Sequence, residues 1–263
     1  MNENVKWIAA SVAVVGALIG GLVWFTRGAR APEPPPPAVV DATPPPVVEE
    51  EPAVKHPLPE PEPAEALPSL DNSDTPMRSA LETLFGKGAV EQFAVTDDIV
   101  RHLVVTIDNL TTEHVAERVR PVKRIPGELR VGGEEDSFVL DPANFERYKP
   151  LVELLRAMDT QFLTSTYVRY YPLFQEANAN LGHPPEYFND RLIQVIDHLL
   201  ETPDVPHPVA LTRPGMRYEY ADPGIESRSA GQKLLIRMGG ENAAVVKTKL
   251  RELRAALVSQ PPR

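Results

Sequence analysis

The chain has 263 residues, a formal net charge of −10 and no cysteine. The missing cysteine excludes disulfides, thiolate chemistry and cysteine-ligated zinc sites, and it fits either side of a membrane. Six scattered histidines show no two at helical ligand spacing, so we expect no metal site.

Residues 7–25 follow a short tail, residues 1–6, and contain no charged side chain. In a helix this stretch spans about 28 Å, close to the hydrocarbon thickness of a bilayer. The only two tryptophans, Trp7 and Trp24, lie at its ends, where aromatic rings prefer the headgroup level. The apolar stretch is also longer than that of a cleaved signal peptide. We therefore expect a retained single-pass transmembrane helix over residues 7–25.

Within this stretch Gly16 and Gly20 form a GxxxG pattern. Small residues four apart let two membrane helices approach closely, so self-association through this face is one interpretation. The other is that glycine is simply common in membrane helices.

Residues 26–68 are predicted to form a disordered linker rich in proline and glutamate. The part from Pro32 to Pro68 holds 14 of the 29 prolines and eight acidic residues. Proline fixes φ and removes the N–H donor, which favours extended polyproline II over helix or strand pairing. We expect a semi-rigid spacer; a short proline-rich recognition motif is the alternative.

An anchor, a spacer and a distal domain form the arrangement expected of a bacterial envelope protein. The charges beside the anchor, Lys6 before it and Arg27 and Arg30 after it, do not decide the orientation. The extended acidic spacer favours a single-pass protein of the bacterial inner membrane, with its C-terminal domain in the periplasm.

Residues 69–263 are long enough for one domain with a sizeable core. Apolar periodicity, helix caps and Gly or Pro stops predict seven helices and two hairpins. The helices are expected at 74–85, 97–110, 141–155, 160–181, 186–201, 225–238 and 241–258. One hairpin pairs 128–131 with 137–140, and the other pairs 209–212 with 217–220. The fold class is therefore mainly α with small β-hairpins (α+β), without the βαβ alternation of a parallel sheet.

Searches for known catalytic patterns give negative results. The sequence has no GxGxxG after a strand, no GxxxxGK[ST], no HExxH and no GxSxG. We therefore assign no catalytic residue, no metal ligand and no cofactor, and we expect no nucleic-acid partner.

The predicted helix over 186–201 carries a polar stripe beside its apolar face. The stripe contains Tyr187, Arg191, Gln194 and His198, at spacings of four, three and four. Such side chains can bind a carboxylate or sugar hydroxyls. They also suit the boundary of a packed helix, where they satisfy internal hydrogen bonds.

The C-terminal end of the chain is basic. Residues 227–263 hold eight basic and two acidic residues, and Lys247, Arg251 and Arg254 share one face of the last helix. One interpretation is a site for an anionic partner, such as envelope lipid phosphates or an acidic protein. The other is a helix face paired with the acidic remainder of the domain.

Three motifs resemble an uncharacterised bacterial domain-of-unknown-function family, DUF3014. They are YYPLFQEA (170–177), YFNDRLIQVIDHLLETP (187–203) and YADPGIESRSAGQKLLIRMGGENAAVVKTKLRELR (220–254). The resemblance extends from about Leu67 to the C-terminus and implies a single-pass membrane protein with a proline-rich spacer. It implies no catalytic residue, because the family has no established activity.

Two functions remain open from the sequence. The first is a membrane-tethered interaction, scaffolding or ligand-binding module of the cell envelope. The second is a tethered hydrolase of an envelope polymer, in which carboxylates such as Asp190 or Asp197 act as acid and base.

Overall fold

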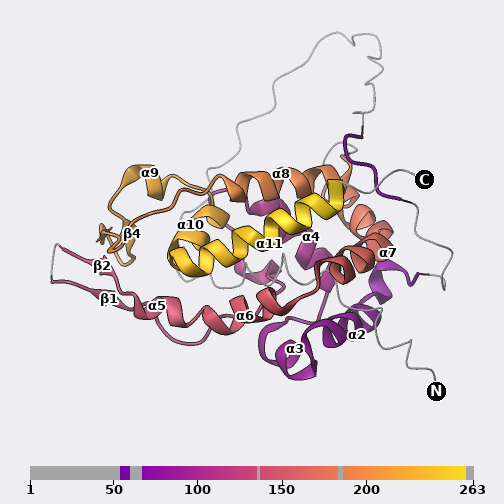
Figure 1. Cartoon of the computed structure of the whole chain (residues 1–263), viewed down its shortest axis with the longest axis horizontal. Coiled ribbons are helices and arrows are strands. Elements are labelled where there is room, and N and C mark those ends of the chain that lie inside the picture. Colours follow the sequence, from indigo (N-terminus) through magenta and orange to yellow (C-terminus); the bar gives the residue numbers. More distant parts are fainter. Residues whose placement is uncertain (1–53, 60–66, 135–136, 183–185, 259–263) are drawn as a thin grey trace, which may run out of the picture.

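The computed structural model describes residues 54–59, 67–134, 137–182 and 186–258 (Figure 1). The predicted tail (1–6), the predicted transmembrane helix (7–25) with Gly16 and Gly20, and most of the predicted linker lie outside these residues. No helix in the described ranges has the length and apolar character needed to cross a bilayer.

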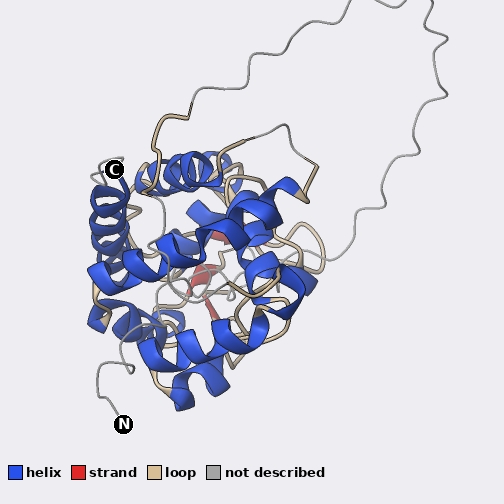
Figure 2. Cartoon of the chain, turned by 90° about the vertical axis from the view of Figure 1, so that its right-hand side faces the viewer, coloured by secondary structure: helices blue, strands red, loops and turns tan. Residues whose placement is uncertain are grey.

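The described part of the chain is mainly helical, with short strands (Figure 2). Its 3-10 helices are η3 (Leu70–Asn72) and η4 (Glu117–Val119). Its α-helices are α2 (Asp74–Phe85), α3 (Lys87–Phe93), α4 (Ile99–Asn109), α5 (Ala143–Glu146), α6 (Lys149–Ala157), α7 (Thr160–Ala179), α8 (Phe188–Leu200), α9 (Pro223–Glu226), α10 (Ala230–Arg237) and α11 (Gly240–Val258). Its strands are β1 (Val131–Gly132), β2 (Val139–Leu140), β3 (Leu211–Thr212) and β4 (Glu219–Tyr220).

The main core lies where α4, α7, α8 and α11 meet (Figure 1). Val104, Phe174, Ile196 and Val246 come from these four helices, and each is at most 1% exposed. Apolar side chains recur every three or four residues along α4 and α8, so each helix turns one apolar face to the others. The helical prediction is confirmed by this arrangement.

The two predicted hairpins are also confirmed. β1 pairs with β2 and β3 with β4, both antiparallel. An isolated bridge between Val139 and Ala210 links the two hairpins. Leu140, Leu211 and Tyr220 form part of a second, smaller core beneath them. The hairpins lie at the end of the molecule away from α7 (Figure 1).

Two predicted helices are each divided in the structure. The helix expected from residue 141 becomes α5 and α6, because Pro150 starts α6 instead of bending a continuous helix; its missing N–H is harmless in a first turn. The helix expected over 225–238 becomes α9 and α10, because Ser229 caps α10 by accepting from Gln232 N at 3.2 Å. Helix α3 was not predicted.

Residues 54–59 depart from the linker prediction. This docked segment runs beside the N-terminal end of α8 (Figure 1). Leu58 packs against the main core, as does Leu67 further along the chain. The domain boundary predicted at residue 69 therefore leaves out a segment that the domain holds. A single leucine between prolines has no periodicity, so local pattern reasoning does not detect its burial.

Candidate functional site

The N-terminal end of α8 holds the docked segment through three polar side chains of different kinds, within four residues of one another. The Asp190 carboxylate accepts hydrogen bonds from Lys55 N at 2.9 Å and from His56 N at 2.8 Å. The Tyr187 hydroxyl oxygen accepts from Leu58 N at 2.9 Å. We call Tyr187, Asn189 and Asp190 the α8 clamp.

Asn189 completes the clamp from a buried position. Its side-chain nitrogen donates to the carbonyl oxygen of His56 at 2.9 Å. Its side-chain oxygen is buried and has no hydrogen-bond partner among the described residues. A buried unpaired acceptor costs about 1–3 kcal/mol, so the clamp has one further acceptor to offer to a donor group of a ligand.

Helix α7 fixes the clamp from behind. The Gln175 side chain donates to Glu186 O at 3.0 Å and accepts from Phe188 N at 2.9 Å. The Tyr171 hydroxyl donates to the Gln175 oxygen at 2.7 Å and accepts from Asn189 N at 3.3 Å. These bonds satisfy N–H groups that the start of a helix leaves without an intrahelical partner. The first turn of α8 is therefore held in place by side chains from another helix.

Aromatic packing adds to this support. The ring of Tyr187 lies 5.2 Å from that of Tyr171, and the Phe188 ring stacks on Phe174 at 5.9 Å. Burial, and then the neighbouring Tyr187, raises the pKa of Tyr171 well above its ordinary value. Tyr171 therefore remains a neutral hydrogen-bonding group at every physiological pH.

The polar stripe predicted on α8 does not converge on one ligand. Only Tyr187 contacts the docked segment. Arg191 donates from Nε to Asp108 Oδ1 at 2.8 Å and from Nη2 to Asp108 O at 2.8 Å, which ties α8 to the end of α4. Gln194 is exposed two turns away. Asn189 and Asp190, which complete the clamp, lie outside the predicted stripe: on the helical projection Asp190 is beside it and Asn189 is on the opposite side of the helix.

His198, the last residue of the predicted stripe, contacts α10. Its Nε2 lies 2.8 Å from Ser229 Oγ, and burial lowers the pKa of the imidazole. A histidine beside a serine is a known nucleophilic pair. Here Ser229 is only 8% exposed and its oxygen caps α10, so the pair links two helices.

The predicted basic face of α11 is largely paired inside the domain. Lys247 donates to Thr202 O at 2.7 Å and to Asp204 Oδ1 at 2.9 Å. Arg254 forms a two-pronged ion pair with Asp197 of α8, in which Nη2 lies 3.0 Å from Oδ2. Arg251 alone of the three is exposed. Arg251 is thus the accessible charge of the three, whereas Lys247 and Arg254 are paired within the domain.

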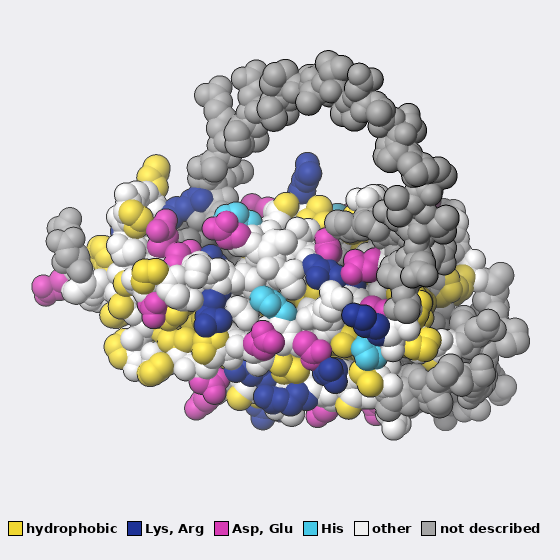
Figure 3. Space-filling view, turned by 90° about the horizontal axis from the view of Figure 1, so that it is seen from above, with side chains coloured by type: hydrophobic (Ala, Val, Ile, Leu, Met, Phe, Trp, Pro, Cys, Tyr) yellow, Lys and Arg dark blue, Asp and Glu magenta, His cyan; other side chains and the backbone are white. Residues whose placement is uncertain are grey.

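The carboxylates named for a hydrolase are both engaged. Asp190 accepts from the docked segment and Asp197 pairs with Arg254. Within the described ranges, no group of three or more acidic or histidine side chains is arranged to hold a metal ion. Acidic and basic side chains are interspersed on the face seen in Figure 3, without a large patch of one sign.

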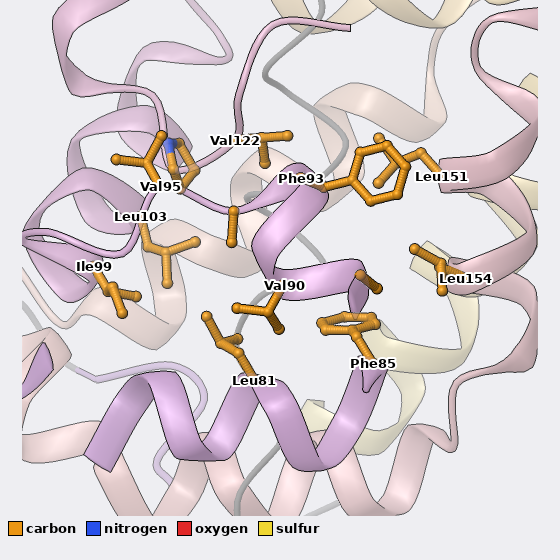
Figure 4. Close-up of a pocket in the computed structure, with 13 residues that line it drawn as sticks. Leu81, Phe85, Val90, Phe93, Val95, Ile99, Leu103, Val122, Leu151 and Leu154 are labelled. Carbon is orange, nitrogen blue, oxygen red and sulfur yellow. The ribbon is translucent and has the colours of Figure 1, made fainter. Parts of the chain in front are cut away.

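An apolar pocket lies on the opposite side of the main core from α8, between α2, α3 and α6 (Figure 4). Its volume is about 40 Å³, and Phe85, Phe93 and Leu154 are half-buried around it. It has room for only two or three water molecules. The pocket contains no titratable side chain, so it has no groups for acid–base chemistry.

One family model, described as "Protein of unknown function (DUF3014)", matches residues 99–254, more than half of the chain. The chain belongs to the DUF3014 family. The match starts at the first residue of α4, so it is shorter than the predicted extent from about Leu67 and leaves out α2 and α3. It includes the α8 clamp but not the docked segment. No curated protein and no solved structure matches the chain.

Proposed function

We propose that this DUF3014 protein is an interaction protein of the bacterial cell envelope, whose domain binds extended peptide segments at the α8 clamp. In this proposal residues 7–25 anchor the chain in the inner membrane and the domain lies in the periplasm. The observation that carries the binding function is the hydrogen bonding of the docked segment's backbone to Tyr187, Asn189 and Asp190.

Recognition through the backbone suits a peptide ligand. Three N–H groups and one carbonyl of the docked segment are paired with side chains of the clamp. Each such bond contributes about 0.5–1.5 kcal/mol net, and more when the acceptor is a carboxylate. An extended segment of another protein that has N–H groups at the three bonded positions carries the same backbone groups, so it can replace the chain's own.

The chain's own segment acts as a competitor. Residues 60–66 separate it from the domain, and short connections give effective concentrations in the millimolar range. An external segment therefore binds only if its affinity or its local concentration overcomes this internal competition. Binding partners that are themselves held at the same membrane meet this condition most easily.

A tethered hydrolase is the alternative function. A retaining or inverting hydrolase needs one carboxylate free as acid and one free as base or nucleophile. The engagement of Asp190 and Asp197 favours binding over this chemistry. An anionic envelope component, the other predicted partner, would meet Arg251 rather than Lys247 or Arg254.

The binding proposal is tested with the full chain in detergent, carrying a glycine–serine replacement of residues 54–59. The replacement keeps the backbone N–H groups but removes Leu58 and both prolines, so it weakens the internal competitor. An acetylated, dye-labelled peptide with the sequence of residues 54–60 (VKHPLPE) is titrated and followed by fluorescence anisotropy. We expect saturable binding that Asp190→Asn weakens about tenfold or more. Glu201→Gln is the control, because it removes one charge from the other end of α8.

Circular dichroism establishes that each variant is folded. Absence of peptide binding to the folded replacement chain contradicts the proposed function. The envelope location is tested separately with C-terminal reporter fusions: an active alkaline phosphatase fusion and a dark green fluorescent protein fusion are expected. The reverse pattern places the domain in the cytoplasm and contradicts the location without affecting the clamp.

A further inference from the structure

We infer that the ligands of the α8 clamp are proline-spaced segments with an apolar residue between the prolines, because the bonded N–H groups fix the register of the segment and the prolines stiffen its extended backbone. The inference rests on the proposed peptide-binding function and names the class of peptide. Its basis is the match between the acceptors of the clamp and the N–H groups of residues 55–59.

Every N–H that the docked segment possesses from residue 55 to residue 59 is used. Lys55 and His56 donate to the two oxygens of Asp190, and Leu58 donates to Tyr187. The other two residues are Pro57 and Pro59, which have no N–H. Counted along residues 55–59, the clamp therefore offers acceptors at the first, second and fourth positions. The segment lacks N–H donors only at the third and fifth positions.

A shift of register breaks this match. Moving the segment forward by one residue places Pro57 and Pro59 at two of the three acceptors, so two hydrogen bonds are lost. Moving it back by one places Pro57 at the Tyr187 hydroxyl, so one is lost together with the contact that Leu58 makes with the main core. The bond from Asn189 to the carbonyl of His56 fixes the same register independently. An unpaired buried carboxylate oxygen is costly, since Asp190 is only 8% exposed.

The two prolines also favour binding by stiffening the segment. Its ring fixes φ near the polyproline II value, so the segment loses less conformational freedom on docking. Leu58 lies between two such residues and is half-buried against the main core. The preferred ligand thus has two residues with free N–H groups, then proline, an apolar residue and proline.

The sequence offers a natural control for the apolar position. Residues 55–59 (KHPLP) are the only part of the chain with this complete pattern. Residues 30–34 (RAPEP) have the same proline spacing, but Glu33 takes the place that Leu58 has in the docked segment. A carboxylate at that position would face the apolar core, so this segment is expected to bind poorly.

The test is an N-methyl scan of the peptide VKHPLPE against the full chain whose residues 54–59 are replaced by glycine and serine. N-methylation of His56 or of Leu58 removes a bonded N–H, and we expect about tenfold weaker binding or more. Replacement of Pro57 by N-methylalanine keeps the position without an N–H and should bind within about threefold of the parent. Pro57→Ala is expected to weaken binding about two- to fivefold through lost preorganisation.

The apolar position is tested with Leu58→Glu and with the peptide of residues 29–35, both of which should bind at least about tenfold more weakly than the parent. Equal binding of the parent and the N-methylated His56 and Leu58 peptides overturns the register inference while leaving peptide binding intact. Failure of the parent peptide itself overturns the proposed function, so the two results are distinguishable.

Discussion

Charged side chains at the start of α8 and along α11 have partners of different kinds. At the N-terminal end of α8, Asp190 pairs with the backbone of a segment 135 residues earlier in the chain. Along α11, Lys247 and Arg254 pair with carboxylates of the domain itself, Asp204 and Asp197. A partner that is a detachable segment leaves an open site behind when it departs, whereas a partner within the domain stays in place. Residues that look equally exposed on a helical projection therefore differ in function.

The largest expected effect comes from Lys247→Glu. The change places a carboxylate against Thr202 O and Asp204, where the native lysine side chain is about nine-tenths buried. An unpaired buried charge destabilises by about 3–5 kcal/mol, so the melting temperature measured by circular dichroism should fall clearly. The matched variant Arg251→Glu, on the same helix but exposed, should change stability by less than about 0.5 kcal/mol. Equal effects of the two changes would show that α11 is not internally paired.

The two aspartates of α8 provide the second test. Asp190→Asn removes the charged acceptor of two N–H groups and should cost about 1–3 kcal/mol in urea unfolding. Asp197→Asn weakens an ion pair whose partners are both about two-fifths exposed, so it should cost about 0–1 kcal/mol. The glycine–serine replacement of residues 54–59 should remove most of the cost of Asp190→Asn, as a double-mutant cycle reports. If the free-energy costs of the two changes are fully additive, Asp190 stabilises α8 itself and does not act through the docked segment.

Leu58→Ala should have a smaller effect, of about 1 kcal/mol, because the leucine is only half-buried. The segment should nevertheless detach more often, since its hydrogen bonds alone must then hold it. Amide hydrogen exchange of Lys55, His56 and Leu58 measures this directly, and exchange should accelerate about fivefold. Unchanged exchange at these three amides would contradict anchoring by the leucine.

The smallest effect concerns pH. Burial lowers the pKa of His198 below its ordinary value of 6.5, so the unfolded chain binds a proton more readily than the folded one. Stability should therefore fall as the pH drops below about 6.5, by a fraction of a kcal/mol. His198→Gln should flatten the pH profile of the melting temperature. Part of the slope should remain, because burial also lowers the pKa of His207. A steeper pH dependence of the melting temperature in His198→Gln would contradict a lowered pKa of His198.

Helix positions and ends were predictable because their determinants are local. Asp74, Pro76 and the apolar residues after them predicted α2, and Gly86, with φ of +81°, ends it as expected. Such signals lie within one or two turns of the residue they control. The divided helices show the limit of this reasoning, since Ser229 acts as a cap inside a stretch that looks continuously helical.

The candidate site was only partly predictable. Tyr187 was identified from its place in a polar stripe, whereas Asn189 and Asp190 were not included with it. Their function depends on a proline-rich segment that has no helical or strand pattern to indicate its docking. Residues 30–34 have the same pattern of residues with and without N–H groups as residues 55–59, so this pattern alone does not indicate which segment docks.

The sequence by itself determined the mainly helical fold class, most helix boundaries and both hairpins, because periodicity, caps and turn residues act over short distances along the chain. The tertiary structure alone decided which charges are free and which are paired. Lys247 meets Asp204 across 43 residues and Asp190 meets Lys55 across 135, and such pairings exist only once the helices have packed. A side chain's type and position on a helix face fix what it is able to bind, but the packing of distant segments fixes what it meets.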